Sequence, residues 1–377
     1  MKLFLMIAAF LFSGSSYSGD EQPRPYNPET TPPSGIERME SIGLSPDGKH
    51  FIFRESGKLF RPWGFNYDHD SGGRLIEDYW DEEWESIEED FREMKALGAN
   101  VVRIHLQLGK IMSSPHQADP KALDRLARLL TLAENTGLYL DITGLATYHK
   151  HDVPQWYQEM EEQERWKVQA NFWKAVAEVC AGSPAVFCYD LMNEPLWPSS
   201  KKETEWLAGE FGGKFFCQRI TLDLDGRDAN IVARQWIDLL VAAIRSKDDQ
   251  HLVTLGVIPW ALTFPGAEPS FYSKEVGENL DFVSVHFYPE EGKVQEAVTA
   301  LKKYDIGKPL VVEEIFPLRC GIKDLDAFIE ASKGIADGWM GFYWGTMPED
   351  YPNNDIAGLL IKSWLEYFRD KTPEMVP

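Results

Sequence analysis

Residues 185–195 read AVFCYDLMNEP, an apolar run that stops at Asn193-Glu194-Pro195. A short unbroken apolar run of this kind is typical of a strand buried on both faces of a parallel sheet. The closing glutamate needs a reason, because a charge at the end of an apolar strand is costly to desolvate. A second such run, 309–314, ends in Glu313-Glu314. The two runs predict two buried strands that each end in a carboxylate.

Similar runs recur along the chain, and helical patterns separate them. We predict strands at 61–66, 100–106, 138–143, 185–191, 251–257, 281–287, 309–314 and 339–344. Helical periodicity covers 82–97, 120–136, 161–181, 228–248, 292–304, 323–336 and 358–369, and it is weakest between strands five and six. Strand-helix alternation requires parallel strands with right-handed crossovers. Eight such units predict an α/β fold, the (β/α)8 or TIM barrel. The alternative, an open doubly wound sheet, normally has a glycine-rich phosphate loop that is missing after strand one.

Two additions to the barrel are expected. Alternating residues around a turn at 50–60 predict a small N-terminal hairpin that plugs the N-terminal end of the barrel. The longest connection, 196–227, follows strand four and predicts an elaborated loop over the site. We assign 35–377 to a single domain, because the eight units use nearly all of that length.

The N-terminal residues predict export. Residues 1–18 have a positive start, an apolar run from Leu3 to Phe12 and a small polar end, which is the layout of a secretory signal peptide. The apolar run is shorter than the roughly 20 residues that span a bilayer. We expect cleavage after Ser18, a proline-rich extended leader at 19–34, and a secreted or periplasmic protein. A buried first helix is the alternative.

Composition excludes several classes of function. The chain has 38 Lys+Arg and 60 Asp+Glu, a formal net charge of −22, which disfavours binding to nucleic acid and to anionic lipid. A hydrophobic content of 44% is ample for a large core. We therefore expect no nucleic-acid partner and no membrane anchor. The sequence does not determine the oligomeric state.

The cysteines and the paired histidines leave alternatives open. Cys180 and Cys188 fall in buried patterns, and no metal-binding C-x-x-C spacing occurs. Cys217 and Cys320 fall in loops, where they either form a disulfide or remain free. His149-Lys150-His151 is either a metal pair or a solvated loop.

The strand ends indicate the chemistry, because catalytic groups of such barrels lie at the C-terminal ends of the strands. Strands four and seven end at Glu194 and Glu314. Two carboxyl groups facing each other across a cleft are what glycoside cleavage requires. Strand alternation predicts that Glu313 faces the helices, in a salt bridge. Strand two carries Arg103, strand six His286-Phe287-Tyr288, and strand eight Trp344.

These five elements, in this strand order, resemble glycoside hydrolase family 5 of the (β/α)8 retaining glycosidases, over roughly residues 50–370. The resemblance implies that Glu194 is the general acid/base and Glu314 the nucleophile, about 5–5.5 Å apart. It also implies that Asn193 holds the sugar 2-hydroxyl and that Arg103 and Tyr288 keep the nucleophile ionised. His286 then orients the substrate or the acid/base, and Trp344 forms a sugar-stacking floor.

One departure weakens a cellulase assignment. Many family cellulases carry a histidine on strand three, where this chain has Thr143 after Asp141-Ile142. Further aromatic residues are candidates either for sugar binding or for packing, namely Tyr67, Trp156, Trp197 and Trp260.

The expected function is that of an exported retaining β-glycoside hydrolase, acting on a mannan or glucan and needing no metal or organic cofactor. The alternatives are a transglycosylase with the same residues, a non-catalytic carbohydrate-binding barrel, and a metal-dependent barrel hydrolase. The sugar, the linkage and the choice between endo and exo action are not decided by the sequence.

Overall fold

The computed structural model of this chain describes residues 39–199, 201–264, 266–342, 344–351 and 356–376. The predicted signal peptide (1–18) and leader (19–34) lie outside the described residues. Within those ranges, every helix is too short or too polar to span a bilayer.

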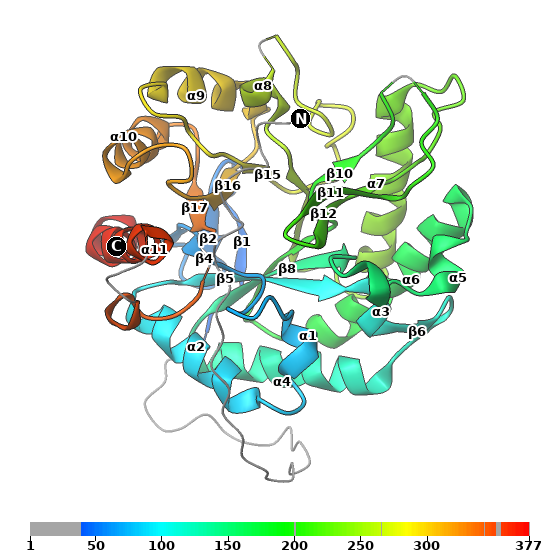
Figure 1. The fold of residues 1–377 in the computed structure, drawn as a ribbon, viewed down its shortest axis with the longest axis horizontal. Helices are drawn as coiled ribbons and strands as arrows, with labels where there is room; N and C mark the ends of the chain where they lie inside the picture. The colour runs from blue at the N-terminus through cyan, green and yellow to red at the C-terminus, as the bar shows by residue number, and fades with distance from the viewer. Residues whose placement is uncertain (1–38, 200, 265, 343, 352–355, 377) are drawn as a thin grey trace.

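A closed ring of parallel strands forms the core, as Figure 1 shows. Around the ring the strands are β4 (Trp63–Tyr67), β5 (Val101–Gln107), β8 (Tyr139–Ala146), β9 (Val186–Asp190), β13 (Leu252–Thr254) with β14 (Gly256–Val257), β15 (Val283–His286), β16 (Leu310–Ile315) and β17 (Gly338–Gly341). β17 pairs with β4, and all the pairings are parallel. The predicted (β/α)8 barrel and its eight strands are confirmed.

Strand five is divided in two by a tyrosine. β13 pairs with β9 and β14 pairs with β15, on either side of Leu255. The Tyr272 hydroxyl donates to the carbonyl of Leu255 at 2.6 Å and accepts from the backbone N–H of Ser284 at 3.0 Å. It therefore satisfies backbone groups that a continuous ladder would otherwise pair.

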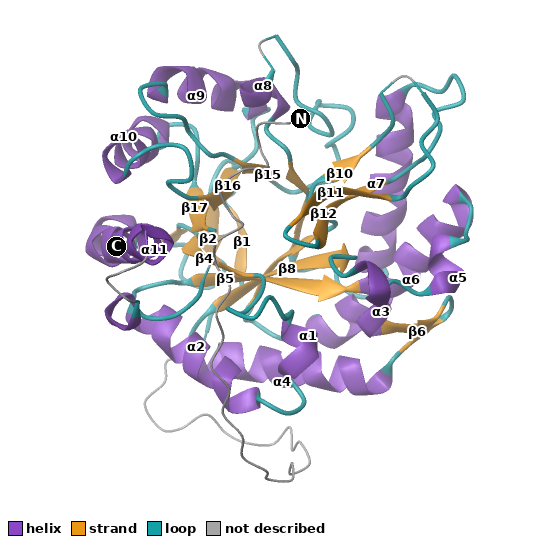
Figure 2. Ribbon diagram, viewed as in Figure 1, coloured by secondary structure: helices purple, strands orange, loops and turns teal. Residues whose placement is uncertain are grey.

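Helices surround the barrel, as Figure 2 shows. The long ones are α2 (Trp84–Ala96), α4 (Pro120–Thr136), α6 (Glu162–Cys180), α7 (Ala229–Arg245), α9 (Val294–Leu301), α10 (Ile322–Ser332) and α11 (Ile356–Met375). Between strands five and six the described residues hold only the one-turn helix α8 (Trp260–Thr263), which explains the weak pattern there. α4 shows how local sequence sets the ends: Asp119 caps its N-terminus, and Gly137 ends it with φ 70°.

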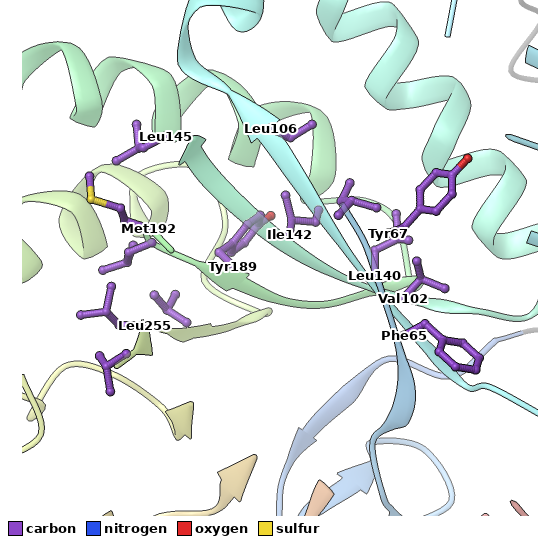
Figure 3. Packing of buried hydrophobic residues seen from close by; sticks show 14 of the residues in the cluster. Phe65, Tyr67, Val102, Leu106, Leu140, Ile142, Leu145, Tyr189, Met192 and Leu255 are labelled. Carbon is purple, nitrogen blue, oxygen red and sulfur yellow. The ribbon is translucent and has the colours of Figure 1, made fainter. Parts of the chain in front are cut away.

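Alternate strand residues divide the core into two layers. On β5, Val102, Ile104 and Leu106 join the apolar layer between strands and helices, part of which Figure 3 shows. The intervening Arg103 and His105 lie inside the barrel and are buried. The barrel interior near the C-terminal ends of the strands is therefore polar, and the site forms there.

The N-terminal plug is confirmed, but it is a three-stranded sheet and not a two-stranded hairpin. β1 (Ile42–Leu44), β2 (Phe51–Phe53) and β3 (Leu59–Phe60) form an antiparallel meander. Phe51 packs against Phe187 and Phe282, near the start of two barrel strands, with ring centroids 5.1 and 5.0 Å apart. The sheet thus closes the end of the barrel opposite the site.

The predicted elaboration after strand four is a second small sheet. It contains β10 (Pro195–Leu196), β11 (Leu207–Phe211) and β12 (Lys214–Arg219), with β12 in the middle. The other short elements are α1 (Ile76–Tyr79), α3 (Leu108–Ile111), β6 (Met112–Ser114), β7 (Gln117–Ala118), α5 (Gln155–Gln158) and the 3-10 turns at Lys150–Asp152, Lys302–Tyr304 and Pro348–Asp350. β12 matters most here, because it delivers side chains to the site.

Candidate active site

Arg103 is the centre of the polar barrel interior. Its guanidinium is fully buried and donates through Nη1 to Glu314 Oε1 at 2.8 Å and to Asn66 Oδ1 at 2.9 Å. Through Nη2 it donates to Asp190 Oδ2 at 2.7 Å and to Asn193 Oδ1 at 3.0 Å. Burial opposes its charge, but Glu313, Asp190 and Glu314 raise the pKa of Arg103 well above its ordinary value. One arginine thus fixes groups from three other strands.

Glu313 lies inside the barrel, so the prediction that it faces the helices is wrong. Its Oε2 lies 3.4 Å from Arg103 Nη2 and 3.4 Å from His286 Nε2, so the predicted salt bridge exists, but in the interior. Alternation along β16 itself turns Glu313 inward, because Val311 joins the interior cluster around Phe51 and Val312 joins the layer under the helices. A β-bulge follows, since Val285 pairs with Val312 whereas His286 pairs with Glu314, and it turns Glu314 inward as well.

Asn66 stabilises the bulge from strand one. Its Nδ2 donates to the carbonyl of Glu313 at 2.9 Å and to that of Gly341 at 3.3 Å. The register of β16 against β17 shifts at the same place, so Asn66 donates where the ladder is irregular. Asn66 was not among the predicted site residues, although it follows the apolar residues of strand one.

Glu314 lies at the open end of the barrel, held by two donors. In addition to the Arg103 contact, it accepts the Tyr288 hydroxyl on Oε2 at 2.6 Å. One carboxylate oxygen of Glu314, one of Glu194 and a ring nitrogen of His286 all lie within 4.8 Å of one another. The structure therefore brings the two strand-end glutamates together, with Arg103, Tyr288 and His286 beside them.

Glu194 is held on both oxygens. His286 Nδ1 lies 2.9 Å from Oε1, and the Cys217 thiol donates to Oε2 at 3.1 Å. Its backbone has φ 47°, a left-handed conformation that costs free energy in a non-glycine residue, and its N–H donates to the carbonyl of Gly256 at 2.9 Å. Its side chain is 21% exposed, against 9% for Glu314. Of the two glutamates, Glu194 is the more accessible.

The remaining predicted residues have partners of their own. Asn193 donates to the carbonyl of Phe216 at 2.9 Å, so the strand-four insertion orients it. On strand three, Thr143 Oγ1 donates to Asp190 Oδ2 at 2.8 Å. Asp190 therefore accepts from both Thr143 and Arg103. This buried acidic residue belongs to the site, and its place within an apolar strand was the signal that could have identified it.

Proton affinities in the site are coupled. Burial lowers the pKa of His286, but the charge of Glu314 and the hydrogen bonds that His286 donates to Glu194 and Glu313 raise it to about 10. Burial raises the pKa of Glu194, but the His286 hydrogen bond holds it below its ordinary value. Burial raises the pKa of Glu314, and the opposing effects of His286 and Arg103 do not cancel this. In the free site, the extra proton therefore resides mainly on the imidazole.

The cysteine alternative is decided for the described residues, whereas the alternatives for the paired histidines stay predictions. Cys217 and Cys320 are free thiols, so the disulfide considered above is not formed. Cys217 is instead turned toward Glu194, and both burial and that carboxylate raise the pKa of its thiol well above the ordinary value. Among the described residues, no group of three potential metal ligands includes His149 or His151.

The aromatic candidates are mostly packed. Trp344 is 1% exposed, and its indole N–H donates to Asp90 Oδ1 at 3.1 Å. Its role as a sugar-stacking floor stays a prediction, because its ring is buried here. Tyr67 is buried and donates to Asp90 Oδ2 at 2.6 Å. Trp156, Trp197 and Trp260 are partly exposed, and Trp260 stacks on Phe264, which is 51% exposed.

A (β/α)8 barrel with paired glutamates at the ends of strands four and seven defines a glycoside hydrolase class of architecture. The chain matches the cellulase family model, glycosyl hydrolase family 5, over residues 63–314, which is well over half of its length. The protein therefore belongs to glycoside hydrolase family 5, and the predicted family is confirmed.

Known proteins with similar sequences and folds include several mannanases. The chain is 24% identical to mannan endo-1,4-beta-mannosidase A of Podospora anserina, over 76% of this chain and 70% of that protein. An exo-beta-1,4-mannosidase from Opitutaceae bacterium strain TAV5 matches with TM-score 0.63 and 16% identity. That match covers 88% of this chain but only 62% of the exo-mannosidase chain. A beta-1,4-mannanase of the sea hare Aplysia kurodai matches with TM-score 0.59 and 17% identity, over 89% of this chain and 99% of that one.

Proposed function

We propose that this protein is an exported retaining hydrolase of β-1,4-mannosidic bonds, with Glu314 as the nucleophile and Glu194 as the acid/base. The observation that carries the proposal is the close approach of these two carboxylates, within 4.8 Å between oxygens. Inverting enzymes separate their carboxyl groups by roughly 6.5–9.5 Å to admit a water molecule, so the spacing here favours the retaining mechanism.

In the first step, Glu314 attacks the anomeric carbon while the bond to the leaving oxygen breaks and Glu194 protonates that oxygen. The attacking carboxylate must be charged, and Arg103 at 2.8 Å and Tyr288 at 2.6 Å favour that form. The acid must carry a proton, whereas the free site keeps the pKa of Glu194 low. Transfer of one proton across the 2.9 Å bond from His286 Nδ1 to Glu194 Oε1 produces the required form.

In the second step, water hydrolyses the glycosyl ester of Glu314. The ester carries no charge, so the pKa of the neighbouring Glu194 falls. Glu194 is therefore ionised at this stage and can act as a base. Glu194 then accepts a proton from the water that attacks the anomeric carbon on the face left by the first leaving group. Two displacements on opposite faces give net retention, and return of the proton from Glu194 to His286 Nδ1 restores the starting state of the site.

Mannan is proposed as the substrate on two grounds. The sequence relative and two of the structural neighbours above are named for β-1,4-mannoside cleavage. Thr143 also stands where many cellulases of the family carry a histidine, and here it bonds Asp190. Export is proposed from the N-terminal sequence alone.

The test is a substrate panel with stereochemical analysis. Wild type, Glu194→Ala, Glu314→Ala and the exposed control Glu205→Ala are assayed on mannan, mannooligosaccharides, β-glucan, xylan and aryl β-mannoside. We expect wild type and control to cleave mannosides with retention, and each active-site variant to lose at least 1000-fold in kcat.

Azide separates the two roles. With Glu194→Ala, azide attacks the glycosyl-enzyme and yields the β-glycosyl azide. With Glu314→Ala, azide occupies the place of the lost carboxylate and yields the α-azide. The same azide product from both variants would contradict the assigned roles, and equal activity of all four proteins would contradict catalysis at this site.

A further inference from the structure

The unexplained feature beneath the site is a pair of buried carboxyl groups in which three of the four oxygens have no donor. Asp141 Oδ1 and Oδ2 and Glu313 Oε1 have no hydrogen-bond partner, and each residue is 0% exposed. The two carboxyl groups lie within hydrogen-bonding reach of each other. Two buried ionised carboxylates side by side, without donors, would be strongly unfavourable.

One proton resolves these unsatisfied contacts. A neutral Asp141 has an O–H that donates to Glu313 Oε1, which is otherwise unpaired. Burial and the charge of Glu313 raise the pKa of Asp141 well above its ordinary value, in agreement with a neutral side chain. Glu313 then keeps the charge, because Arg103 and His286 both lie 3.4 Å from its Oε2.

The charge of Glu313 is directed at the back of His286. Oε2 of Glu313 lies 3.4 Å from ring Nε2, and Oε1 of Glu194 lies 2.9 Å from ring Nδ1. The imidazole thus stands between a carboxylate deep in the barrel and the carboxylate at the reaction centre. Gly256 on strand five leaves room for Glu313 beside His286, because a Cβ on Gly256 would lie 2.3 Å from Glu313 Oε2.

We propose that Glu313, which faces the barrel interior and is paired with a neutral Asp141, is a positioning residue that holds His286 doubly protonated and so supplies the proton that Glu194 donates. This inference rests on the proposed function for its consequence in catalysis. Glu313, which precedes the proposed nucleophile, thus acts on His286 inside the barrel and does not form the helix-facing salt bridge predicted from the sequence.

Other charged groups also face the imidazole, and the test must account for them. They are Arg103 and His105 from β5, Asp141 from β8, Asp190 and Glu194 from the end of β9, Glu314 from β16, and Tyr288 beyond β15. His105 stays neutral, because burial and then Arg103 lower its pKa to about 3. Glu313, in contrast to these groups, lies 3.4 Å from Nε2, so its charge can be removed selectively.

The experiment is a nitrogen-15 NMR titration of the His286 ring in the full chain, assigned by comparison with His286→Gln. In wild type, both ring nitrogens are expected to be protonated at pH 7. Glu313→Gln keeps an acceptor for Nε2 but removes the charge, and should lower the titration midpoint by at least about one pH unit. Asp141→Asn replaces a neutral acid by a neutral amide, and should leave the midpoint within about 0.3 unit.

Each outcome is decisive. A neutral His286 ring in wild type at pH 7, or an unchanged midpoint in Glu313→Gln, overturns the proposal. A large shift in Asp141→Asn overturns the neutral state of Asp141. If Glu313→Gln does not fold, the wild-type titration still tests whether His286 is doubly protonated, and the Asp141→Asn titration still tests whether Asp141 is neutral.

The kinetic consequence is measured separately. If the protein hydrolyses mannosides, Glu313→Gln should move the basic limb of the kcat/KM pH profile to lower pH, because the acid loses its proton earlier. An unchanged basic limb in an active variant would overturn the link to Glu194. A protein with no activity would refute the proposed function and leave the NMR result to decide the state of His286.

Discussion

Adding one methyl group at Gly256 should disrupt the site from behind. A Cβ at this position would lie 2.3 Å from Glu313 Oε2, 2.9 Å from His286 Nε2 and 3.0 Å from Arg103 Nη2. Ordinary carbon–oxygen contact is about 3.5 Å. The Glu313 carboxylate would therefore have to move by about 1 Å, although Arg103 and His286 hold it.

The magnitude follows from two costs. Overpacking a filled core position costs about 1–3 kcal/mol. Weakening a buried hydrogen bond to a charged group adds about 1.5–3 kcal/mol. We expect Gly256→Ala to lower the free energy of unfolding by about 2.5–6 kcal/mol and to reduce kcat/KM.

Gly182→Ala is the matched control, because Gly182 is exposed and a Cβ there would have nothing within 4 Å. It should be neutral or stabilise by about 0.4–1 kcal/mol through the unfolded state. Urea unfolding of both variants and wild type measures the difference. Equal free energies of unfolding for the two alanine variants would refute the inward position of Glu313.

Four further outcomes are expected. Tyr288→Phe removes the hydroxyl that donates to the nucleophile at 2.6 Å, which should cost about 1.5–3 kcal/mol, or roughly 10- to 150-fold in kcat/KM; unchanged kinetics would contradict that contact. Iodoacetamide followed by peptide mapping should leave Cys217 unmodified in the native protein and modified after unfolding, because burial and the adjacent carboxylate raise its pKa well above the ordinary value. Burial opposes the charge of Asp68, but the neighbouring histidine lowers its pKa to about 2, so this charge should contribute about 2 kcal/mol of stability above pH 4. That contribution should be lost as the pH falls toward 2, so Asp68→Asn should be less stable than wild type at pH 7 and converge with it on acidification; a pH-independent difference would argue against it. Expression of the full chain with N-terminal sequencing of the exported product should show cleavage after Ser18, and retention of the intact chain inside the cell would contradict export.

Local patterns in the sequence were enough for the barrel. Apolar strand runs and helical spacing follow from which face each residue buries, and they repeat eight times with little ambiguity. The pattern failed between strands five and six, where Tyr272 splits the strand and α8 is a single turn. Tyr272 comes from the loop that follows strand five, and such a contact leaves no periodic signal at the strand that it divides.

The sequence by itself determined the two strand-end glutamates, because their place after apolar runs is a local property. Only the tertiary structure decided what surrounds them. Glu314 faces inward beside Glu313 because a bulge against β15 shifts the register, and Cys217 reaches Glu194 because β12 folds back over the barrel. Strand register and long-range contacts depend on which strands become neighbours in the folded protein. Local patterns in the sequence do not contain that information.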